Sequence, residues 1–189
     1  MNKFRASFSI LDTWNKGDYE NAVKMYFKID SFENEAMRQG KKWHEEWAKH
    51  TEQTKTLPII FGGKELKKPI SELKMTAQIY NWLEMVGVID CVDEPVIYEY
   101  KTGITESQTY ANSHQVGMYG LLLTYNDILV NRCELYHYNQ YKNQVDMSII
   151  HITDKLIEDS LNFVVTTAGE MHEYLETNSL YEKLKKNEN

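Results

Sequence analysis

The chain has 189 residues, of which 42% are apolar and 12% aromatic, enough to bury a substantial core. Its formal net charge of −7 argues against a protein that coats DNA by neutralising phosphates with lysine and arginine. No stretch approaches the roughly 18 apolar residues of a membrane span, and the N-terminus lacks the apolar centre of a secretory signal. With three prolines and no low-complexity linker or repeat, residues 1–189 are expected to form a single domain that does not act at a membrane.

Helices are predicted in the first part of the chain, residues 1–50. Residues 12–29 indicate one or two helices with several aromatic positions, and residues 32–50 indicate another helix. The second helix has a buried stripe at helical spacing, formed by Ala36, Gly40, Trp43 and Trp47. His44 follows Gly40 by four residues and lies at the edge of this stripe. Taken alone, such a histidine is more often a core-edge residue than a ligand.

Strands dominate the predicted core, residues 51–152. Residues 70–80 alternate between an apolar face with Met75 and a polar face with Glu72. Further strands are predicted at 85–92, 96–102, 132–138 and 145–152, with a helix at 110–125. Thr153 can cap a last amphipathic helix, within residues 153–178. This order predicts an α/β fold in which helices flank a mixed β-sheet.

The hairpin formed by residues 87–101 carries acids on both strands. Glu99 and Lys101 alternate onto one face, and a turn centred between Glu94 and Pro95 places Asp90 opposite Glu99. Opposed residues of antiparallel strands are roughly 4.5–5.5 Å apart, so the two carboxylates repel unless a cation lies between them. A divalent cation with oxygen ligands fits this place. The alternative is an exposed hairpin with a surface ion pair at Lys101, and the hairpin alone does not decide between them.

The Glu-x-Lys triplet itself is weak evidence, because it occurs three times. The triplet at 65–67 follows two glycines in a loop-like stretch. The triplet at 72–74 lies on a strand, but no apolar strand ending in Asp precedes it. Only the triplet at 99–101 has a partner acid on an adjacent apolar strand, so the sequence predicts a site at this triplet alone.

Four motifs in this order resemble the PD-(D/E)XK nuclease superfamily, most of all the branch with the RecB nuclease domain and the CRISPR adaptation nucleases. The matching residues are Gly40 and His44; Gly87, Ile89 and Asp90; Glu99, Lys101, Thr102 and Gly103; Gln115 and Tyr119. The resemblance implies a restriction-endonuclease-like core. It also implies a metal-dependent deoxyribonuclease that hydrolyses phosphodiester bonds, more often as an exonuclease than as an endonuclease. DNA repair, recombination or phage DNA processing would be its setting, and single-stranded DNA or duplex ends its substrate.

The resemblance also assigns roles to individual residues around one or two Mg²⁺ or Mn²⁺ ions. Carboxylate ligands are Asp90 and Glu99, and further ligands are the Tyr100 backbone carbonyl and a nitrogen of His44. Lys101 orients the attacking water or stabilises charge in the transition state. Gln115 and Tyr119 position Lys101 and the DNA backbone. Lys41 and Lys42, one turn before His44, either meet that backbone or form a solvated surface.

Many relatives in that branch hold an iron–sulfur cluster with four cysteines. This sequence has only Cys91 and Cys133, so no iron–sulfur cluster is expected, and nothing predicts a disulfide between them. Two isolated cysteines fit a reducing cytoplasm, of a microbe or of a host cell in which a viral protein acts. Two other functions stay open: a catalytically silent nucleic-acid-binding module, and a nuclease subunit of a larger helicase or recombination complex. A protein partner or a homo-oligomer also stays open.

Overall fold

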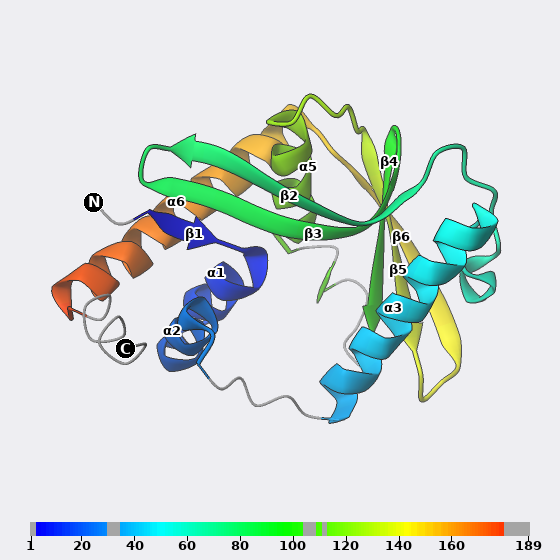
Figure 1. Cartoon of the computed structure of the whole chain (residues 1–189), viewed down its shortest axis with the longest axis horizontal. Coiled ribbons are helices and arrows are strands. Elements are labelled where there is room, and N and C mark those ends of the chain that lie inside the picture. Colours follow the sequence, from blue (N-terminus) through cyan, green and yellow to red (C-terminus); the bar gives the residue numbers. More distant parts are fainter. Residues whose placement is uncertain (1–2, 30–34, 104–108, 111–112, 180–189) are drawn as a thin grey trace.

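The computed structural model describes residues 3–29, 35–103, 109–110 and 113–179. Within them a mixed sheet has the strand order β1-β3-β4-β5-β6, with β2 paired to β3 (Figure 1). The strands are β1 (Phe4–Ala6), β2 (Ile70–Tyr80), β3 (Leu83–Asp93), β4 (Val96–Thr102), β5 (Arg132–Asn139) and β6 (Gln144–His151). The helices are α1 (Phe8–Asn15), α2 (Tyr19–Phe27), α3 (Glu35–Thr54), α5 (Gln115–Thr124) and α6 (Asp154–Thr177), with a 3₁₀ turn at Ile59–Phe61. The predicted class, a mixed β-sheet flanked by helices, is confirmed.

Two hairpins build the middle of the sheet. β2 and β3 pair antiparallel along most of their length, and β3 then pairs antiparallel with β4 through its last residues, Cys91–Asp93. Cys91 lies opposite Tyr98, the register that a turn at Glu94 and Pro95 predicts. β4 runs parallel to β5, and β5 pairs antiparallel with β6. The strands predicted at 70–80 and 96–102 are confirmed with the same bounds.

The sheet carries a separate hydrophobic core on each face. Along β4 the side chains alternate, so that Ile97 packs into one core while Tyr98 and Tyr100 pack into the other. The larger core contains buried residues of α5 and α6, which lie behind the β2–β3 hairpin in Figure 1. The smaller core is aromatic and includes Trp47 of α3, the helix that crosses in front of β4, β5 and β6 in Figure 1. Helices from opposite layers therefore flank the strand that carries Glu99.

Several helix predictions were wrong in their bounds. The first helix begins at Phe8 rather than Asp12, and it is separate from α2 because Gly17 has a left-handed φ of 82° and Asp18 caps the next helix. α3 continues to Thr54, and Ala36, predicted in its buried stripe, is exposed. α5 begins at Gln115 rather than residue 110. The predicted residues 32–34 and 111–112 lie outside the described residues.

The ends of the sheet differ in how well the sequence predicts them. The three-residue strand β1, which pairs in parallel with Leu83–Met85, was not predicted. The last helix is confirmed, and the Thr153 hydroxyl caps it by accepting a hydrogen bond from the Leu156 N–H at 3.2 Å. None of the helices in the described residues has both the length and the apolar character needed to cross a membrane.

Candidate active site

The candidate site lies beside an unpaired stretch of β3. One edge of β3 pairs with β2, whereas the other edge pairs with β1 at Leu83–Met85 and with β4 at Cys91–Asp93. Among the described residues, no strand pairs with that second edge between these two segments. The Tyr119 hydroxyl of α5 donates a hydrogen bond to the Val88 carbonyl there, at 2.9 Å. The gap therefore brings α5 against β3 just before Asp90.

Asp90 joins three elements at the end of this gap. Its Oδ2 accepts a hydrogen bond from the backbone N–H of Tyr100 at 2.7 Å, and its Oδ1 lies 3.1 Å from Nδ1 of His44. The backbone pairing of β3 with β4 stops at Cys91 and Tyr98, so Asp90 and Glu99 occupy the next step of the same register. The side chain of Asp90 thus replaces backbone pairing at the point where the strands separate. The predicted opposition of Asp90 and Glu99 agrees with this register.

Glu99 is a buried carboxylate with one oxygen that accepts hydrogen bonds and one that has no partner in the described chain. The residue is 2% exposed, and its Oε1 accepts hydrogen bonds from Lys101 Nζ at 2.7 Å and from Gln115 Nε2 at 2.9 Å. Oε2 has no hydrogen-bond partner among the described residues. Burial and then the charge of Asp90 raise the pKa of Glu99 to about 7, against the opposing charge of Lys101. A buried, open carboxylate oxygen beside a second carboxylate is a chemical fit for a divalent cation.

Lys101 is held as a charged group. Its side chain is 19% exposed, and its Nζ lies 5.8 Å from the centre of the Tyr110 ring. Burial lowers the pKa of Lys101, but the charges of Glu99 and Asp90 outweigh burial and leave the pKa raised. Lys101 is therefore protonated at neutral pH, which fits electrostatic stabilisation better than proton abstraction.

His44 reaches the site from α3. Burial lowers its pKa, but the hydrogen bond to Asp90 and the charge of Asp90 outweigh burial, so the pKa is raised. Gly40, one turn earlier, lets this helix lie close to the end of β4, since a Cβ at Gly40 would lie 3.2 Å from Oγ1 of Thr102. The glycine and the histidine thus act together: the first sets how near the helix lies, and the second points at Asp90.

Gln115 and Tyr119 share one face of α5, as their spacing predicts. Gln115 Nε2 donates to Oε1 of Glu99 and also lies 2.7 Å from the Tyr119 hydroxyl. Gln115 and Lys101 thus donate to the same oxygen of Glu99, and the role of Gln115 and Tyr119 in positioning Lys101 stays a prediction. Tyr119 is only 6% exposed and its hydroxyl is bonded within the protein. A contact of either residue with DNA stays a prediction.

Tyr100 lies between the two motif residues of β4 and is almost fully buried. Its ring stacks on Phe61 with centroids 4.9 Å apart, and this fixes the strand that carries Glu99 and Lys101. Its backbone carbonyl as a metal ligand stays a prediction. Cys91 and Cys133 are both buried free thiols, so no disulfide joins them.

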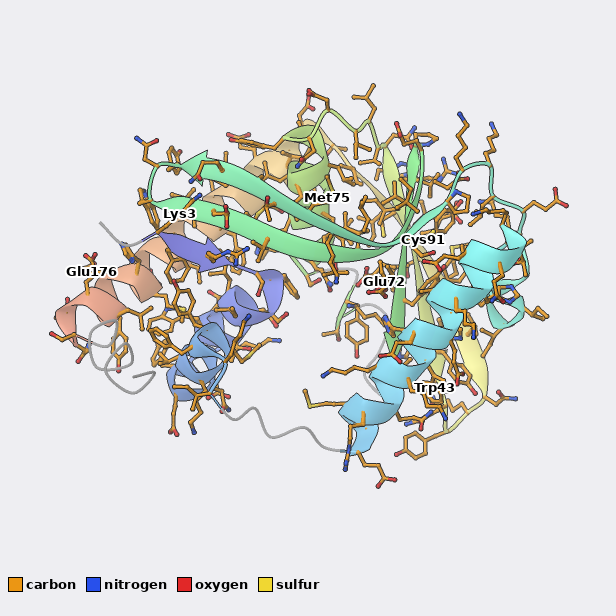
Figure 2. All side chains as sticks on the ribbon, in the orientation of Figure 1. Lys3, Trp43, Glu72, Met75, Cys91 and Glu176 are labelled. Carbon is orange, nitrogen blue, oxygen red and sulfur yellow. The ribbon has the colours of Figure 1, made fainter. Side chains whose placement is uncertain are left out.

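Glu72 is the site residue that sequence analysis did not select. Figure 2 places it near α3, and its carboxylate belongs to a group with His44 and Asp90 whose ligand atoms all lie within 4.8 Å of one another. The Glu-x-Lys triplet at 72–74 was rejected because no acid precedes it on an apolar strand. The acid that could have identified Glu72 follows it in the sequence, because β2 and β3 form a hairpin that brings Glu72 level with Asp90.

A groove of about 810 Å³ opens over these side chains. Its lining includes Gly40, Lys41, His44, Glu72, Asp90 and Lys101. Glu99 lies beneath this lining rather than in it, since it is buried. Of the two lysines for which the sequence leaves a DNA contact or a solvated surface open, Lys41 lines the groove, whereas Lys42 Nζ lies 4.0 Å from Glu46 Oε1 on the exposed surface of α3.

No protein-family model and no curated protein matches the sequence. Solved structures do match the fold. SSO0001 is 11% identical with a TM-score of 0.61, covering 88% of this chain and 76% of the other. The alkaline exonuclease LHK-Exo from Laribacter hongkongensis, solved in complex with dAMP, is 12% identical with a TM-score of 0.54, covering 93% of each chain.

A phage-related exonuclease from Haemophilus somnus is 16% identical with a TM-score of 0.53, covering 87% of this chain and 83% of the other. At identities this low, the structural match shows a common architecture. The chain therefore has the restriction-endonuclease-like α/β fold that these exonuclease structures share.

Proposed function

We propose that this chain is a metal-dependent deoxyribonuclease of the PD-(D/E)XK type that hydrolyses phosphodiester bonds as an exonuclease. The observation that carries the proposal is the buried Glu99 carboxylate, which has one oxygen without a hydrogen-bond partner in the described chain. This carboxylate is 2% exposed, fixed through Oε1 by Lys101 and Gln115, and open at Oε2. A purely structural carboxylate at this depth would have both oxygens satisfied, since an unpaired buried polar atom is costly.

Asp90, Glu99, His44 and the Tyr100 carbonyl are the groups that would hold Mg²⁺ or Mn²⁺, and the imidazole favours Mn²⁺. When bound, such an ion supplies positive charge at the scissile phosphate and makes water a stronger nucleophile at neutral pH. The groove needs that charge, because Glu72 and Asp90 in its lining repel a phosphate.

The remaining side chains hold charge and orientation. Lys101 keeps its proton and its positive charge within reach of the groove, where it would stabilise negative charge that develops on the phosphate. Gln115 fixes the carboxylate plane of Glu99 through Oε1, which leaves Oε2 free to bind a ligand. Lys41 supplies a second positive group to the groove lining, suited to a contact with the DNA backbone.

The exonuclease mode rests on the fold neighbours. LHK-Exo was solved with dAMP, a nucleoside monophosphate of the kind that stepwise digestion of DNA releases. We propose that this chain likewise releases mononucleotides from DNA ends, and that the RecB-like branch is its place in the superfamily. A role in DNA repair, recombination or phage DNA processing would follow from that activity.

The test is digestion of end-labelled linear duplex, single-stranded DNA and covalently closed circular DNA with Mn²⁺. We expect mononucleotides from the linear substrates, an intact circle, and no products when a chelator replaces the ion. Glu99→Gln should abolish digestion. Glu65→Gln, which makes the same change in another Glu-x-Lys triplet that lies outside the site, should not. Binding without cleavage by the wild-type chain would instead favour a catalytically silent module or a subunit that needs partners.

A further inference from the structure

A second pocket, of about 390 Å³, lies along the neighbouring face of α3. Trp43 and His44 are consecutive residues, so their side chains leave the helix about 100° apart. His44 lines the groove of the candidate site, whereas Trp43 lines the second pocket. The sheet repeats this division, because Thr102 lines the groove and Tyr138, its partner in the β4–β5 ladder, lines the pocket. The pocket therefore adjoins the groove both along α3 and across the ends of the strands.

The pocket presents apolar and aromatic side chains to solvent. In its lining, Ile59 is 82% exposed and Ile60 is 39% exposed, and Trp43 and Tyr138 are half-buried. The rings of Trp43 and Tyr138 meet edge to face, with centroids 5.5 Å apart. Exposed apolar side chains that gather in one place mark a binding surface, and aromatic rings among them suit a flat ligand.

Aromatic contacts connect this pocket to the strand that carries the candidate site. Trp43 stacks on Trp47 with ring centroids 6.2 Å apart, and Trp47 packs against Tyr100 with centroids 5.6 Å apart. Tyr100 lies between Glu99 and Lys101 on β4. The row of rings therefore holds the pocket in a fixed position relative to these two residues.

The charges of the lining distinguish the pocket from the groove. Lys41 lines the groove, whereas none of the described residues that line the pocket is a lysine or an arginine. Glu46 does line the pocket, and its carboxylate repels a phosphate. A nucleobase is uncharged and has a flat face that stacks on an aromatic ring whatever the sequence. The pocket is thus suited to a base rather than to the DNA backbone.

We propose that this pocket binds one unpaired nucleobase, stacked on Trp43, of the DNA strand whose backbone lies in the groove. The inference rests on the proposed function and names its substrate class, a strand that is single-stranded next to the site. A base within a duplex is stacked and paired, so it must leave the helix before it enters a side pocket. Single strands should therefore be digested faster than blunt duplexes.

The test measures the affinity of the whole chain for short labelled strands by fluorescence anisotropy, with a chelator present so that no strand is cut. It compares a thymidine strand with an abasic strand of the same length, which keeps the phosphates and lacks the bases. The wild-type chain should bind the thymidine strand at least about fivefold more tightly, the scale of one stacked base. This ratio is measured within one protein, so a partly unfolded variant does not imitate the loss of stacking.

Three variants locate the preference. Trp43→Leu, which stays apolar but lacks a ring, should bind both strands equally. Trp43→Phe keeps an aromatic face and should retain most of the preference. Tyr80→Leu, which removes a 48% exposed ring at the end of β2, is the control and should keep the full preference.

Equal binding of the two strands by the wild-type chain, or a full preference in Trp43→Leu, would overturn the inference and leave the pocket to a protein partner. The proposed function is judged separately, by digestion with Mn²⁺. A chain that prefers the thymidine strand and releases no nucleotides refutes the nuclease alone. A chain that digests DNA and binds both strands equally refutes the base pocket alone.

Discussion

The ion pair between Glu99 and Lys101 differs from the ion pairs at the surface. Lys16 and Asp12 are 2.6 Å apart with side chains 68% and 29% exposed, whereas Lys101 and Glu99 are 2.7 Å apart with side chains 19% and 2% exposed. Exposed pairs contribute roughly 0–1 kcal/mol, while buried pairs pay a large desolvation penalty. The alternative of an exposed hairpin with a surface pair is therefore wrong. A buried pair that leaves Glu99 Oε2 without a hydrogen-bond partner in the described chain is better explained by a role in ligand binding or catalysis than by a contribution to folding stability.

Lys101→Ala tests the charge of this lysine. We expect single-turnover cleavage of labelled DNA with saturating Mn²⁺ to slow at least about a hundredfold, the scale of losing one electrostatic stabiliser, while DNA binding changes little. Lys101→Arg keeps the charge but not the shape, so its rescue should be partial. Lys67→Ala, the matching change at the exposed lysine of the triplet at 65–67, is the control. Unchanged turnover in Lys101→Ala would remove this residue from the mechanism.

Mn²⁺ binding should weaken as the pH falls from 8 to 6. The pKa of Glu99 is raised to about 7, by burial and by Asp90, and the pKa of His44 is raised because Asp90 outweighs burial. Both groups must lose a proton to act as ligands, so protons compete with the ion and the affinity should fall at least about tenfold. Calorimetry in buffers of different ionisation enthalpy measures the affinity and the released protons together. A pH-independent affinity would contradict these ligands.

The same shifts predict the stability of the metal-free protein. Both folded-state pKa values lie above the unfolded ones, so the stability that these two groups contribute is present in acid and is lost as the pH rises through each folded-state pKa, which for Glu99 is about 7. The melting temperature without metal should therefore fall between pH 6 and 8, and Mn²⁺ should restore it most at pH 8. A melting temperature that rises over this range without metal would contradict the shifts.

At the scale of elements, local patterns predicted the longer strands, whereas contacts between distant residues determined the position of Glu72 and the strand β1. Alternation gave β2, and the turn at Glu94 and Pro95 gave the register that sets Asp90 level with Glu99. Glu72 was not predicted as a site residue, because a one-residue shift near Tyr80 decides whether it faces Asp90, and no local pattern encodes that shift. The short strand β1 was not predicted for a similar reason, since three residues carry little periodicity and its partner strand lies far along the chain.

The packing of α5 on α6 fixes the helix that carries Gln115. A Cβ at Gly117 would lie 2.9 Å from the Ser160 Cβ and 3.0 Å from the Leu156 carbonyl oxygen, both on α6. Gly117→Ala should therefore lower the free energy of unfolding by about 1–3 kcal/mol and reduce activity by shifting α5. Chemical denaturation measures the first effect and DNA digestion the second.

Gly169→Ala is the matched control for this packing, because a Cβ there would meet only Trp82 at 4.0 Å. Replacing a helical glycine by alanine should stabilise this variant by up to about 1 kcal/mol and leave activity unchanged. Equal effects of the two alanines would show that α5 does not depend on this close approach.

At the scale of the whole molecule, the site lies where the two layers of helices come together around one gap in the sheet. α5, from the larger core, brings Gln115 to Glu99, and α3, from the side of the aromatic core, brings His44 to Asp90. The unpaired edge of β3 between β1 and β4 leaves the Val88 carbonyl free to bond Tyr119, which holds α5 beside the acids. The sheet thus positions the acids, and each helix layer adds one polar side chain to them.

The most direct test of this account is a crystal soaked in Mn²⁺ and measured for anomalous scattering. The account predicts an anomalous peak about 2.1 Å from carboxylate oxygens of both Asp90 and Glu99, with Oε2 as the Glu99 ligand. Glu99→Gln crystals treated in the same way should lose that peak while keeping the fold. A wild-type crystal with Mn²⁺ bound elsewhere and Oε2 of Glu99 still without a ligand would contradict the account.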